Sequence, residues 1–358
     1  MSVLAGVRVL ELAAIGPVPW AAMLLADMGA DVLRIDRPGV DDRPMPTTRG
    51  RTAVQLDLKT AEGMRAAHAL VRGADVLLEG MRPGALERLG LAPATCLQLN
   101  PALVMGRMTG WGQAGPLADR AGHDINCIAL NGVLHSIGRD KPVPPLNLVA
   151  DYGGGAAFLL IGVLAALLSA RATGQGQVVD AAMVDGSASL MTLAYERLML
   201  GRWRDERGVN SLDGGAPWYD VYETYDGRYM AVGCNEPQFY RVFLTTLGLE
   251  PEKVPDRANR AHWPALRALF ARCFAERTRE EWTALFEPTD ACVTPVLSMT
   301  EAPGHPHNVA RGTFRLFEGH MIPGPAPRFG GERGEVAGAT TTVSANVAIS
   351  RWAVRSGG

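Results

Sequence analysis

The sequence has few features that would crosslink the chain or hold a metal ion. It contains five cysteines, an odd number, and no C-x-x-C spacing. Its seven histidines include no H-E-x-x-H motif. These absences argue against a disulfide framework and a structural zinc site, and we expect no bound metal. A reducing compartment, and therefore a cytoplasmic location, is expected.

The chain also lacks an excess of charge of either sign. It has 35 Lys and Arg against 37 Asp and Glu, a formal net charge of -2. With 47% hydrophobic and 20% charged residues the composition is that of an ordinary globular domain. We therefore expect neither a nucleic-acid partner nor binding to an anionic membrane. The 358 residues suffice for a large domain plus a smaller one, or for two domains.

Long hydrophobic runs are absent as well. The most apolar segment, residues 156–170, is shorter than the roughly 20 residues that a membrane-spanning helix needs. It fits a buried helix better. The first twelve residues have no basic region followed by a long apolar core, so that a secretory signal is not expected.

The N-terminal pattern predicts a βαβ unit and therefore a parallel sheet. Residues 7–12 and 31–36 are rich in aliphatic and β-branched residues and predict strands. Residues 20–28 between them predict a helix, with Pro19 in its first turn and Gly29 at its end. Alternation continues, with strands expected at 74–79, 103–108 and 177–183 and helices at 60–72 and 155–170.

The second half of the chain has a different pattern. Residues 200–215 are polar and glycine-rich, which predicts a linker. A mixed region follows, with strands expected at 219–224 and 228–233 and a helix at 263–274. The Pro- and Gly-rich tail, 320–358, is expected to wrap back over the first domain.

The first βαβ unit does not carry a dinucleotide-binding loop. Asp36 ends the second strand, where an acid that binds ribose would stand. The loop AAIGPVP, however, has one glycine and two prolines in place of G-x-G-x-x-G, whose glycines let a pyrophosphate approach the backbone. NAD binding at this loop is therefore not expected.

Four polar residues in three stretches stand out, and each stretch has a structural and a functional interpretation. His123 and Asp124 follow a glycine in AGHDINC, at the edge of an apolar run, where unpaired polar groups are costly. Asp151 precedes three glycines and an apolar helix, and Glu236 lies between a strand and a helix. A buried hydrogen-bonded histidine and two acids at helix starts are the structural interpretation. A further set could be surface charges or phosphate ligands: Arg37, Lys59, Arg82, Arg88 and Arg107.

Taken together, the motifs resemble those of a known family. They are GVRVLELAAIGP, MLLADMGADVLRIDRP, LDLK, GMRPGALERLG, RMTGWGQAGP, AGHDIN, PPLNLVADYGGG, GQVVDAAMVDG, LDGGAPWYDVYE, VGCNEPQFY and DACVTPVL. Their order and spacing resemble those of α-methylacyl-CoA racemases, in the class III, formyl-CoA transferase-like, CoA-transferase superfamily. The resemblance implies an α/β fold, with a Rossmann-like large domain around a parallel sheet, a smaller α+β domain and an interlocked dimer. The implied parts are 1–199, a linker 200–215, a small domain 216–312, and a segment 313–358 that returns to the large domain.

The resemblance also implies an activity: racemisation of 2-methylacyl-CoA by a two-base 1,1-proton transfer through an enolate. His123, supported by Glu236, would deprotonate the (S)-epimer and Asp151 the (R)-epimer, and the backbone N–H of Asp124 would stabilise the enolate oxygen. No cofactor is implied, because coenzyme A is part of the substrate. The residues implied to bind CoA and substrate are Arg37, Leu56, Asp57, Leu58, Lys59, Gly80, Met81, Arg82, Arg88, Gly122, Asp124, Ile125, Asn126 and Cys127.

Two other functions remain open at this point. Transferases of the same superfamily use an aspartate at the position of Asp151 as a covalent nucleophile, so Asp151 alone does not decide. A catalytically silent acyl-CoA-binding protein is the third possibility. Trp20 and Cys234 depart from the family pattern and would alter the acyl pocket or its rim. Met183, Met191 and Met199 are either acyl contacts or, more commonly, helix core.

Overall fold

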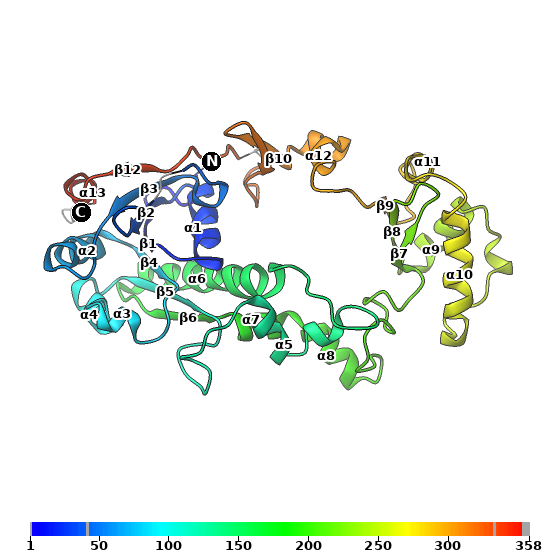
Figure 1. Cartoon of the computed structure of the whole chain (residues 1–358), viewed down its shortest axis with the longest axis horizontal. Helices are drawn as coiled ribbons and strands as arrows, with labels where there is room; N and C mark the ends of the chain where they lie inside the picture. Colours follow the sequence, from blue (N-terminus) through cyan, green and yellow to red (C-terminus); the bar gives the residue numbers. More distant parts are fainter. Residues whose placement is uncertain (1, 41–42, 332–333, 353–358) are drawn as a thin grey trace. The chain divides into compact units, whose positions relative to one another are not determined.

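The computed structural model describes residues 2–40, 43–331 and 334–352, and its helices and strands are shown in Figure 1. The chain forms two compact units. The first comprises Met1–Val133, Pro145–Thr192 and His305–Gly358, and the second comprises Leu134–Pro144 and Leu193–Gly304. Each unit has a hydrophobic core of its own.

A seven-stranded parallel sheet forms the centre of the first unit, in the order β12-β3-β2-β1-β4-β5-β6. The strands are β1 (Arg8–Leu12), β2 (Asp31–Asp36), β3 (Arg51–Gln55), β4 (Val76–Glu79), β5 (Val104–Thr109), β6 (Val178–Ala182) and β12 (Thr341–Val343). From β1 the chain first adds strands on one side and then, from β4, on the other. The direction of winding therefore reverses between β1 and β4, which is where open α/β sheets bind ligands.

Helices cover both faces of this sheet (Figure 1). On one face lie α1 (Pro17–Asp27) and α6 (Ala157–Thr173), which contact each other and the strands beneath them. On the other lie α2 (Ala61–Gly73), α4 (Pro93–Leu99) and α13 (Ala345–Arg351). Because side chains alternate along a strand, Leu10 and Leu12 of β1 face the second group, whereas Glu11 points the other way. The remaining α-helices and strands of the first unit are α3 (Ala85–Arg88), α5 (Asp124–Leu130), α7 (Met183–Leu190), α12 (Pro306–Arg311), β10 (Phe314–Phe317) and β11 (His320–Pro323).

The structure confirms the predicted βαβ start and its parallel sheet. The strand predicted at 31–36 is β2, and Gly29 follows the end of α1 with a positive φ of 93°. The helix, however, begins at Pro17, three residues earlier than predicted, because both prolines fit the first turn. Strand β3 was not predicted, because its segment RTAVQ has polar residues at both ends.

The apolar helix is longer than the sequence suggested. A π-helical segment, η3 (Leu148–Ala156), runs directly into α6, giving 26 continuous helical residues. The most apolar 18-residue window of this helix has a mean hydropathy of 2.1. This helix is therefore long enough to cross a membrane, contrary to the prediction from the apolar run alone. Half of its most apolar window is buried within the protein, against β5, β6 and α1, and core helices of soluble proteins have the same length and composition.

The second unit is a small α+β layer. Its antiparallel strands are β7 (Tyr219–Glu223), β8 (Tyr229–Gly233) and β9 (Val293–Pro295). Its helices are α9 (Pro237–Thr246), α10 (Trp263–Phe274) and α11 (Arg279–Phe286), and α8 (Thr192–Met199) begins at its boundary. Stacked and edge-to-face rings form its core, among them Phe243, Phe270, Phe274 and Phe286.

The polar segment 200–215 is an ordered part of the second unit and not an extended linker. Its centre is Asn210, which is fully buried. The Asn210 amide donates to the backbone oxygens of Arg204 and Glu206 and to the Asp213 carboxylate. Because the buried Asn210 amide forms hydrogen bonds with groups of its own loop, this polar, glycine-rich segment has a fixed conformation. The domain limits implied by the resemblance otherwise stay a prediction.

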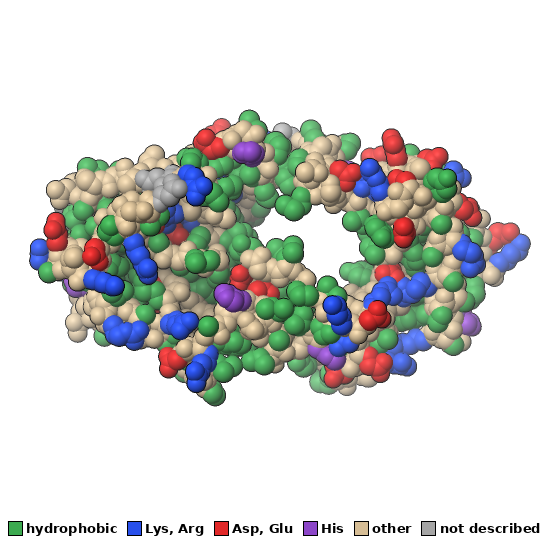
Figure 2. All heavy atoms as spheres, viewed as in Figure 1, with side chains coloured by type: hydrophobic (Ala, Val, Ile, Leu, Met, Phe, Trp, Pro, Cys, Tyr) green, Lys and Arg blue, Asp and Glu red, His purple; other side chains and the backbone are tan. Residues whose placement is uncertain are grey.

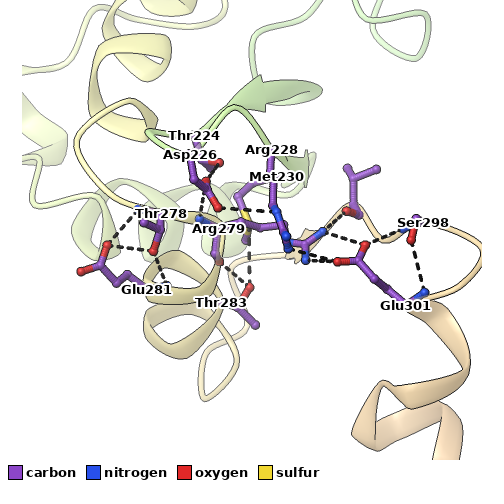
Figure 3. Close-up of polar contacts among 11 residues, drawn as sticks. Thr224, Asp226, Arg228, Met230, Thr278, Arg279, Glu281, Thr283, Ser298 and Glu301 are labelled. Carbon is purple, nitrogen blue, oxygen red and sulfur yellow. Dashed lines mark hydrogen bonds and ion pairs between the residues drawn. The ribbon is translucent and has the colours of Figure 1, made fainter.

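The end of the second unit is fastened by a surface carboxylate (Figure 3). Glu301 accepts hydrogen bonds from Arg279 at 2.6 and 3.2 Å and from Arg228 at 3.1 Å. It also accepts from the backbone N–H of Ser298 at 2.9 Å. The hydrogen bonds from Arg279 and Ser298, with Arg279 the largest influence, lower the pKa of Glu301 to about 2. The segment that leaves this unit is therefore tied to α11 and to the β7–β8 hairpin.

The C-terminal segment returns to the first unit. β12 pairs in parallel with β3, with Thr341 opposite Thr52, and the fully buried Trp352 packs into the core. Its indole N–H donates to Asp31 at 2.8 Å. On the molecular face shown in Figure 2, charged side chains of both signs are interspersed with apolar ones, as the net charge of -2 suggests.

Candidate active site

Two adjoining clefts lie at the carboxyl edge of the parallel sheet, at the point where the winding reverses. A cleft of about 390 Å³ is lined by the ends of β1, β2 and β3 and the residues that follow them. A larger one of about 550 Å³ is lined by the loops that follow β1, β4 and β5, together with His123 and Asp151. Ala13, Arg37 and Met81 line both clefts. A long ligand can therefore extend from one cleft into the other.

His123 stands immediately before α5 and is exposed. Its own backbone N–H donates to the Asn126 side chain at 3.1 Å, which fixes the start of the helix. The preceding Gly122 lies against Trp111: a Cβ at this position would come within 2.7 Å of the indole ring. The glycine thus lets the histidine loop pack on a tryptophan while the imidazole stays in the cleft.

Asp124 is buried, and its carboxylate has a role that the sequence analysis did not anticipate. It accepts hydrogen bonds from the backbone N–H groups of Ala150, at 2.6 Å, and Asp151, at 2.8 Å. One side chain therefore joins the start of α5 to η3, the helix that carries Asp151. In the first turn of α5 the Asn126 N–H donates to the His123 carbonyl at 2.9 Å, whereas the N–H groups of the first two helical residues, Asp124 and Ile125, have no preceding helical turn to accept them.

Asp151 is not a helix cap, as one interpretation of the sequence had it, because η3 begins earlier, at Leu148. Burial raises the pKa of its carboxyl. A hydrogen bond from Asn147, 3.0 Å away, opposes the rise; the Asp124 charge adds to it and His123 reduces it. The electrostatic interaction with His123 and the shared cleft put the two candidate bases in one site.

Gly16, in the loop after β1, faces the Asp151 carboxylate. It has a φ of 77° and a ψ of −118°, a conformation that glycine tolerates and other residues avoid. A Cβ at this position would lie 3.5 Å from Asp151 Oδ2. The glycine therefore keeps one side of the carboxylate open to the cleft. In the sequence, Gly16 belongs to the motif GVRVLELAAIGP and to a loop that excludes a dinucleotide site, but neither pattern predicts its contact with Asp151.

Most of the residues predicted to bind CoA line the two clefts. Arg37, Leu56, Asp57, Leu58, Lys59 and Met81 line the smaller one, and Arg37, Gly80, Met81, Arg82 and Gly122 line the larger one. The others line neither: Arg88, Asp124, Ile125, Asn126 and Cys127. The Cys127 thiol is buried and donates to the Gly110 carbonyl, and burial raises its pKa to about 12.

Arg107, one of the basic candidates for phosphate binding, is instead held in ion pairs. Its guanidinium donates to Glu79 at 2.7 Å and to Glu87 at 2.9 Å. The other oxygen of Glu79 accepts from the backbone N–H of Met81 at 2.7 Å. Burial raises the pKa of Glu79, while Arg107 and the Met81 N–H oppose the rise. Arg107 thus positions the Glu79 carboxylate, which in turn binds the backbone of the Gly80–Arg82 loop at Met81.

Glu236 belongs to the second unit, whereas His123 and Asp151 belong to the first. It is the residue before α9, it is exposed, and its side chain makes no capping hydrogen bond. Its carboxylate is therefore available to another group. Among the described residues, no group of three or more His, Cys, Asp or Glu side chains is arranged to hold a metal ion.

Comparison with known proteins identifies the family. The model of CoA-transferase family III matches residues 4–340, so this chain belongs to that family. It is 46% identical to the mouse α-methylacyl-CoA racemase over 91% of this chain and 85% of the mouse protein. It is 45% identical to the human α-methylacyl-CoA racemase over 90% of this chain and 86% of the human protein. A crystal structure of a CAIB/BAIF family protein from Brucella suis superimposes with a TM-score of 0.83 at 24% identity, covering 98% of this chain and 99% of that one. That likeness supports the fold.

Proposed function

We propose that this protein interconverts the (R)- and (S)-epimers of 2-methylacyl-CoA thioesters. The observation that carries the proposal is that His123, just before α5, and Asp151, in η3, line one cleft and interact electrostatically. Racemisation at C2 needs two acid/base groups, one on each face of the carbon. The identity of 45–46% to the mouse and human racemases, over about nine-tenths of the chain, supports the same chemistry.

The reaction moves two protons and forms no covalent bond to the enzyme. In one direction His123 removes the C2 proton of the (S)-epimer, the C–H electron pair passes into an enolate, and Asp151 in its protonated form returns a proton to the opposite face. In the other direction Asp151 removes the proton and the imidazolium of His123 returns one. Each positioned acid or base contributes about 10²–10⁴-fold to such a rate.

The enolate oxygen needs hydrogen-bond donors that are already in place. We assign this role to the backbone N–H of Asp124, in the first turn of α5, where the helix leaves its N–H groups without internal acceptors. The Asp124 carboxylate holds this turn next to η3. The same residue thus supplies a donor through its backbone and geometry through its side chain.

The CoA portion of the substrate would occupy the smaller cleft and its junction with the larger one. Arg37 and Lys59 at the rim are suited to phosphate oxygens, and Leu56, Leu58 and Met81 supply apolar surface. Arg82 lies in the larger cleft, along the path to the reacting carbon. The proposed chemistry uses no cofactor, because the thioester itself acidifies the C2 proton. A cytoplasmic location is proposed with it.

We further propose that the protein acts as a homodimer in which Glu236 supports the imidazole of His123. The Glu236 carboxylate is exposed and makes no capping hydrogen bond to α9, so it is suited to accept a hydrogen bond from an imidazolium. Large apolar side chains at the surface support a partner subunit, because extended apolar surface commonly marks an interface. They include Ile161, Leu168, Leu190, Leu198 and Met199. Light scattering on the purified protein would give its mass in solution, and a monomer would contradict this part.

The rival within the family is CoA transfer between two acids through an acyl–Asp151 anhydride. An open carboxylate beside Gly16 is compatible with that role as well. The deciding experiment is NMR of (S)-2-methylacyl-CoA with the protein in D₂O, without an acid acceptor. Deuterium at C2, with both epimers appearing, is expected. No exchange, but movement of CoA once a free acid is added, would contradict the racemase proposal and make Asp151 a nucleophile; CoA binding with neither reaction would indicate a binding protein.

A further inference from the structure

The short loop between β8 and α9 carries Glu236 but gives its side chain no support. Glu236 is followed by Pro237 at the start of α9, and its carboxylate makes no capping hydrogen bond. The direction of the Glu236 side chain therefore depends on how firmly the backbone just before it is held. That backbone consists of Cys234, which is fully buried, and Asn235.

One arginine binds both carbonyl groups of this backbone. Arg257 donates from one guanidinium nitrogen to the Cys234 carbonyl at 3.1 Å and from the other to the Asn235 carbonyl at 2.9 Å. These are the last two carbonyl groups before Glu236. On its other side, the Cys234 N–H donates to the Trp218 carbonyl at 3.0 Å. The loop is thus fixed through both its donors and its acceptors.

The guanidinium is itself held between aromatic rings. Its central carbon lies 4.3 Å from the ring centre of Tyr240 and 5.0 Å from that of Trp218. Trp263, packed edge-on against Trp218, donates its indole N–H to the Arg257 carbonyl at 2.9 Å. A planar guanidinium suits this position, because it stacks on rings and keeps a rigid fork of donors. A lysine ammonium can stack but cannot form the two-nitrogen fork.

The charges around the loop agree with this arrangement. Burial raises the pKa of the Cys234 thiol to about 12; Arg257 opposes the rise and Glu236 adds to it. Glu236 also contributes, after burial, to the raised pKa of Cys292. The Glu236 carboxylate therefore interacts electrostatically with the thiols of Cys234 and Cys292, whose raised pKa values keep them neutral. Arg257 is the cation that binds the loop backbone.

We propose that Arg257 is a positioning residue that sets the direction of the Glu236 carboxylate for its work on His123. The inference rests on the proposed function, in which Glu236 assists proton transfer and takes no part in binding CoA. A loosened loop should therefore lower kcat and leave KM for the acyl-CoA unchanged. Misplacing a supporting group by about 1 Å costs up to about 100-fold in rate, so we expect a 10- to 100-fold loss in kcat.

The experiment compares epimerisation by Arg257→Gln, Arg257→Lys, Glu236→Gln and the double variant Arg257→Gln/Glu236→Gln. Arg260→Gln is the matched control. Arg260 lies on the same segment and also stacks on a ring, 5.0 Å from Trp263, but its hydrogen bond goes to Val209 and not to the Glu236 loop. Thermal unfolding of each variant monitors stability.

The expected result is a kcat defect in Arg257→Gln, with unchanged KM, that is absent in Arg260→Gln and only partly recovered in Arg257→Lys. The double variant should be no slower than Glu236→Gln, because both changes remove one function. Full activity of Arg257→Gln beside an impaired Glu236→Gln would overturn the inference alone, and so would additive losses. A fully active Glu236→Gln would overturn both the inference and the role of Glu236, and an enzyme that never exchanges the C2 proton would overturn the proposed function.

Discussion

Glu79 in the first unit and Glu301 in the second have the same kinds of partner but opposite electrostatics. Glu79 accepts hydrogen bonds from Arg107 and from the backbone N–H of Met81. Glu301 likewise accepts from Arg279 and from the backbone N–H of Ser298. Glu79 is completely buried, and burial raises its pKa. Glu301 lies at the surface, and its donors lower its pKa to about 2. Burial is the largest influence on the pKa of Glu79 and the hydrogen bond from Arg279 is the largest on that of Glu301, which gives the two shifts opposite directions.

The two carboxylates should therefore respond to pH in opposite ways. For Glu79 the pKa is higher in the folded state, so its contribution to stability is complete below its ordinary value of 4.5 and is lost as the pH rises through its folded pKa. For Glu301 the pKa is lower in the folded state, so its contribution is present above 4.5 and is lost as the pH falls toward 2. The following variants test this contrast, in order of their expected effect on catalysis.

Asp151→Asn should have the largest effect, with epimerisation falling by about 10²–10⁴-fold because one base is removed. Like Glu79, Asp151 has a pKa raised by burial, so its ionised form disfavours folding at neutral pH. Its side-chain hydrogen bond comes from the neutral Asn147, so its replacement, unlike that of Glu79, breaks no ion pair with arginine. The variant should accordingly unfold at a higher temperature than the parent at pH 7. Thermal unfolding and initial rates measure both effects, and Asp119→Asn, at an exposed aspartate, is the control. A variant that is inactive and also less stable would contradict the comparison.

Asp124→Ala should have the second-largest effect on catalysis. This carboxylate is buried and, unlike Glu79 and Glu301, accepts its hydrogen bonds from two backbone N–H groups and not from an arginine. Its loss leaves the N–H groups of Ala150 and Asp151 unpaired, at a cost of about 1–3 kcal/mol for a buried group. We expect about 10- to 100-fold slower epimerisation, since the enolate donor and Asp151 lose their common support. Asp124→Asn, which keeps an acceptor oxygen, should recover most of the rate. Equal losses in the two variants would show that the oxygen contacts are unimportant.

Glu79→Gln should mainly weaken folding and CoA binding. Breaking a buried ion pair costs about 3 kcal/mol, and Arg107 would keep only its surface partner Glu87. We expect urea unfolding to show this loss, together with weaker CoA binding, because the Met81 N–H loses its carboxylate. Glu87→Gln is the matched control and should cost less than about 1 kcal/mol, because this partner is exposed. Comparable losses in the two variants would mean that burial does not distinguish the partners.

Glu301→Gln should have the smallest effect. It lies outside the clefts, so kcat and KM should not change. The second unit should unfold slightly earlier than in the parent at pH 7, and the difference should shrink as the pH is lowered from 5 toward 2, where the parent carboxylate takes up its proton. Unfolding curves over this pH range give the result. A difference that grows at low pH would reverse the assigned sign.

Much of the fold could be predicted from local sequence, because its strands and helices have strong periodic patterns. Strand β2 and helix α10 begin and end where the sequence places them. The misses have physical reasons. Polar ends hid β3, whose pairing with β2 and β12 compensates for them. The segment 200–215 has the composition of a linker, and only the burial of Asn210 reveals that it is ordered.

The candidate site was predicted through its motifs, while the groups that hold it in place were not. His123 and Asp151 are recognisable in AGHDIN and ADYGGG, and the structure brings them into one cleft. Glu79, the Asp124 carboxylate and Arg257 act through contacts between residues distant in the sequence, such as Asp124 with Ala150. No local pattern predicts such partners. Arg107 was misread for the same reason: a buried arginine and a phosphate-binding one look alike in sequence.

The pairing of β12 with β3 has a consequence for how the chain is made. Translation delivers β3 near residue 51, but its parallel neighbour and the buried Trp352 arrive about 290 residues later. Ribosomes add about 5–20 residues per second, so this edge of the sheet waits from about 15 seconds to a minute for its last strand. The second unit emerges entirely within that interval. A chaperone that shields strand edges would therefore meet this protein with its smaller unit complete and its larger one still open.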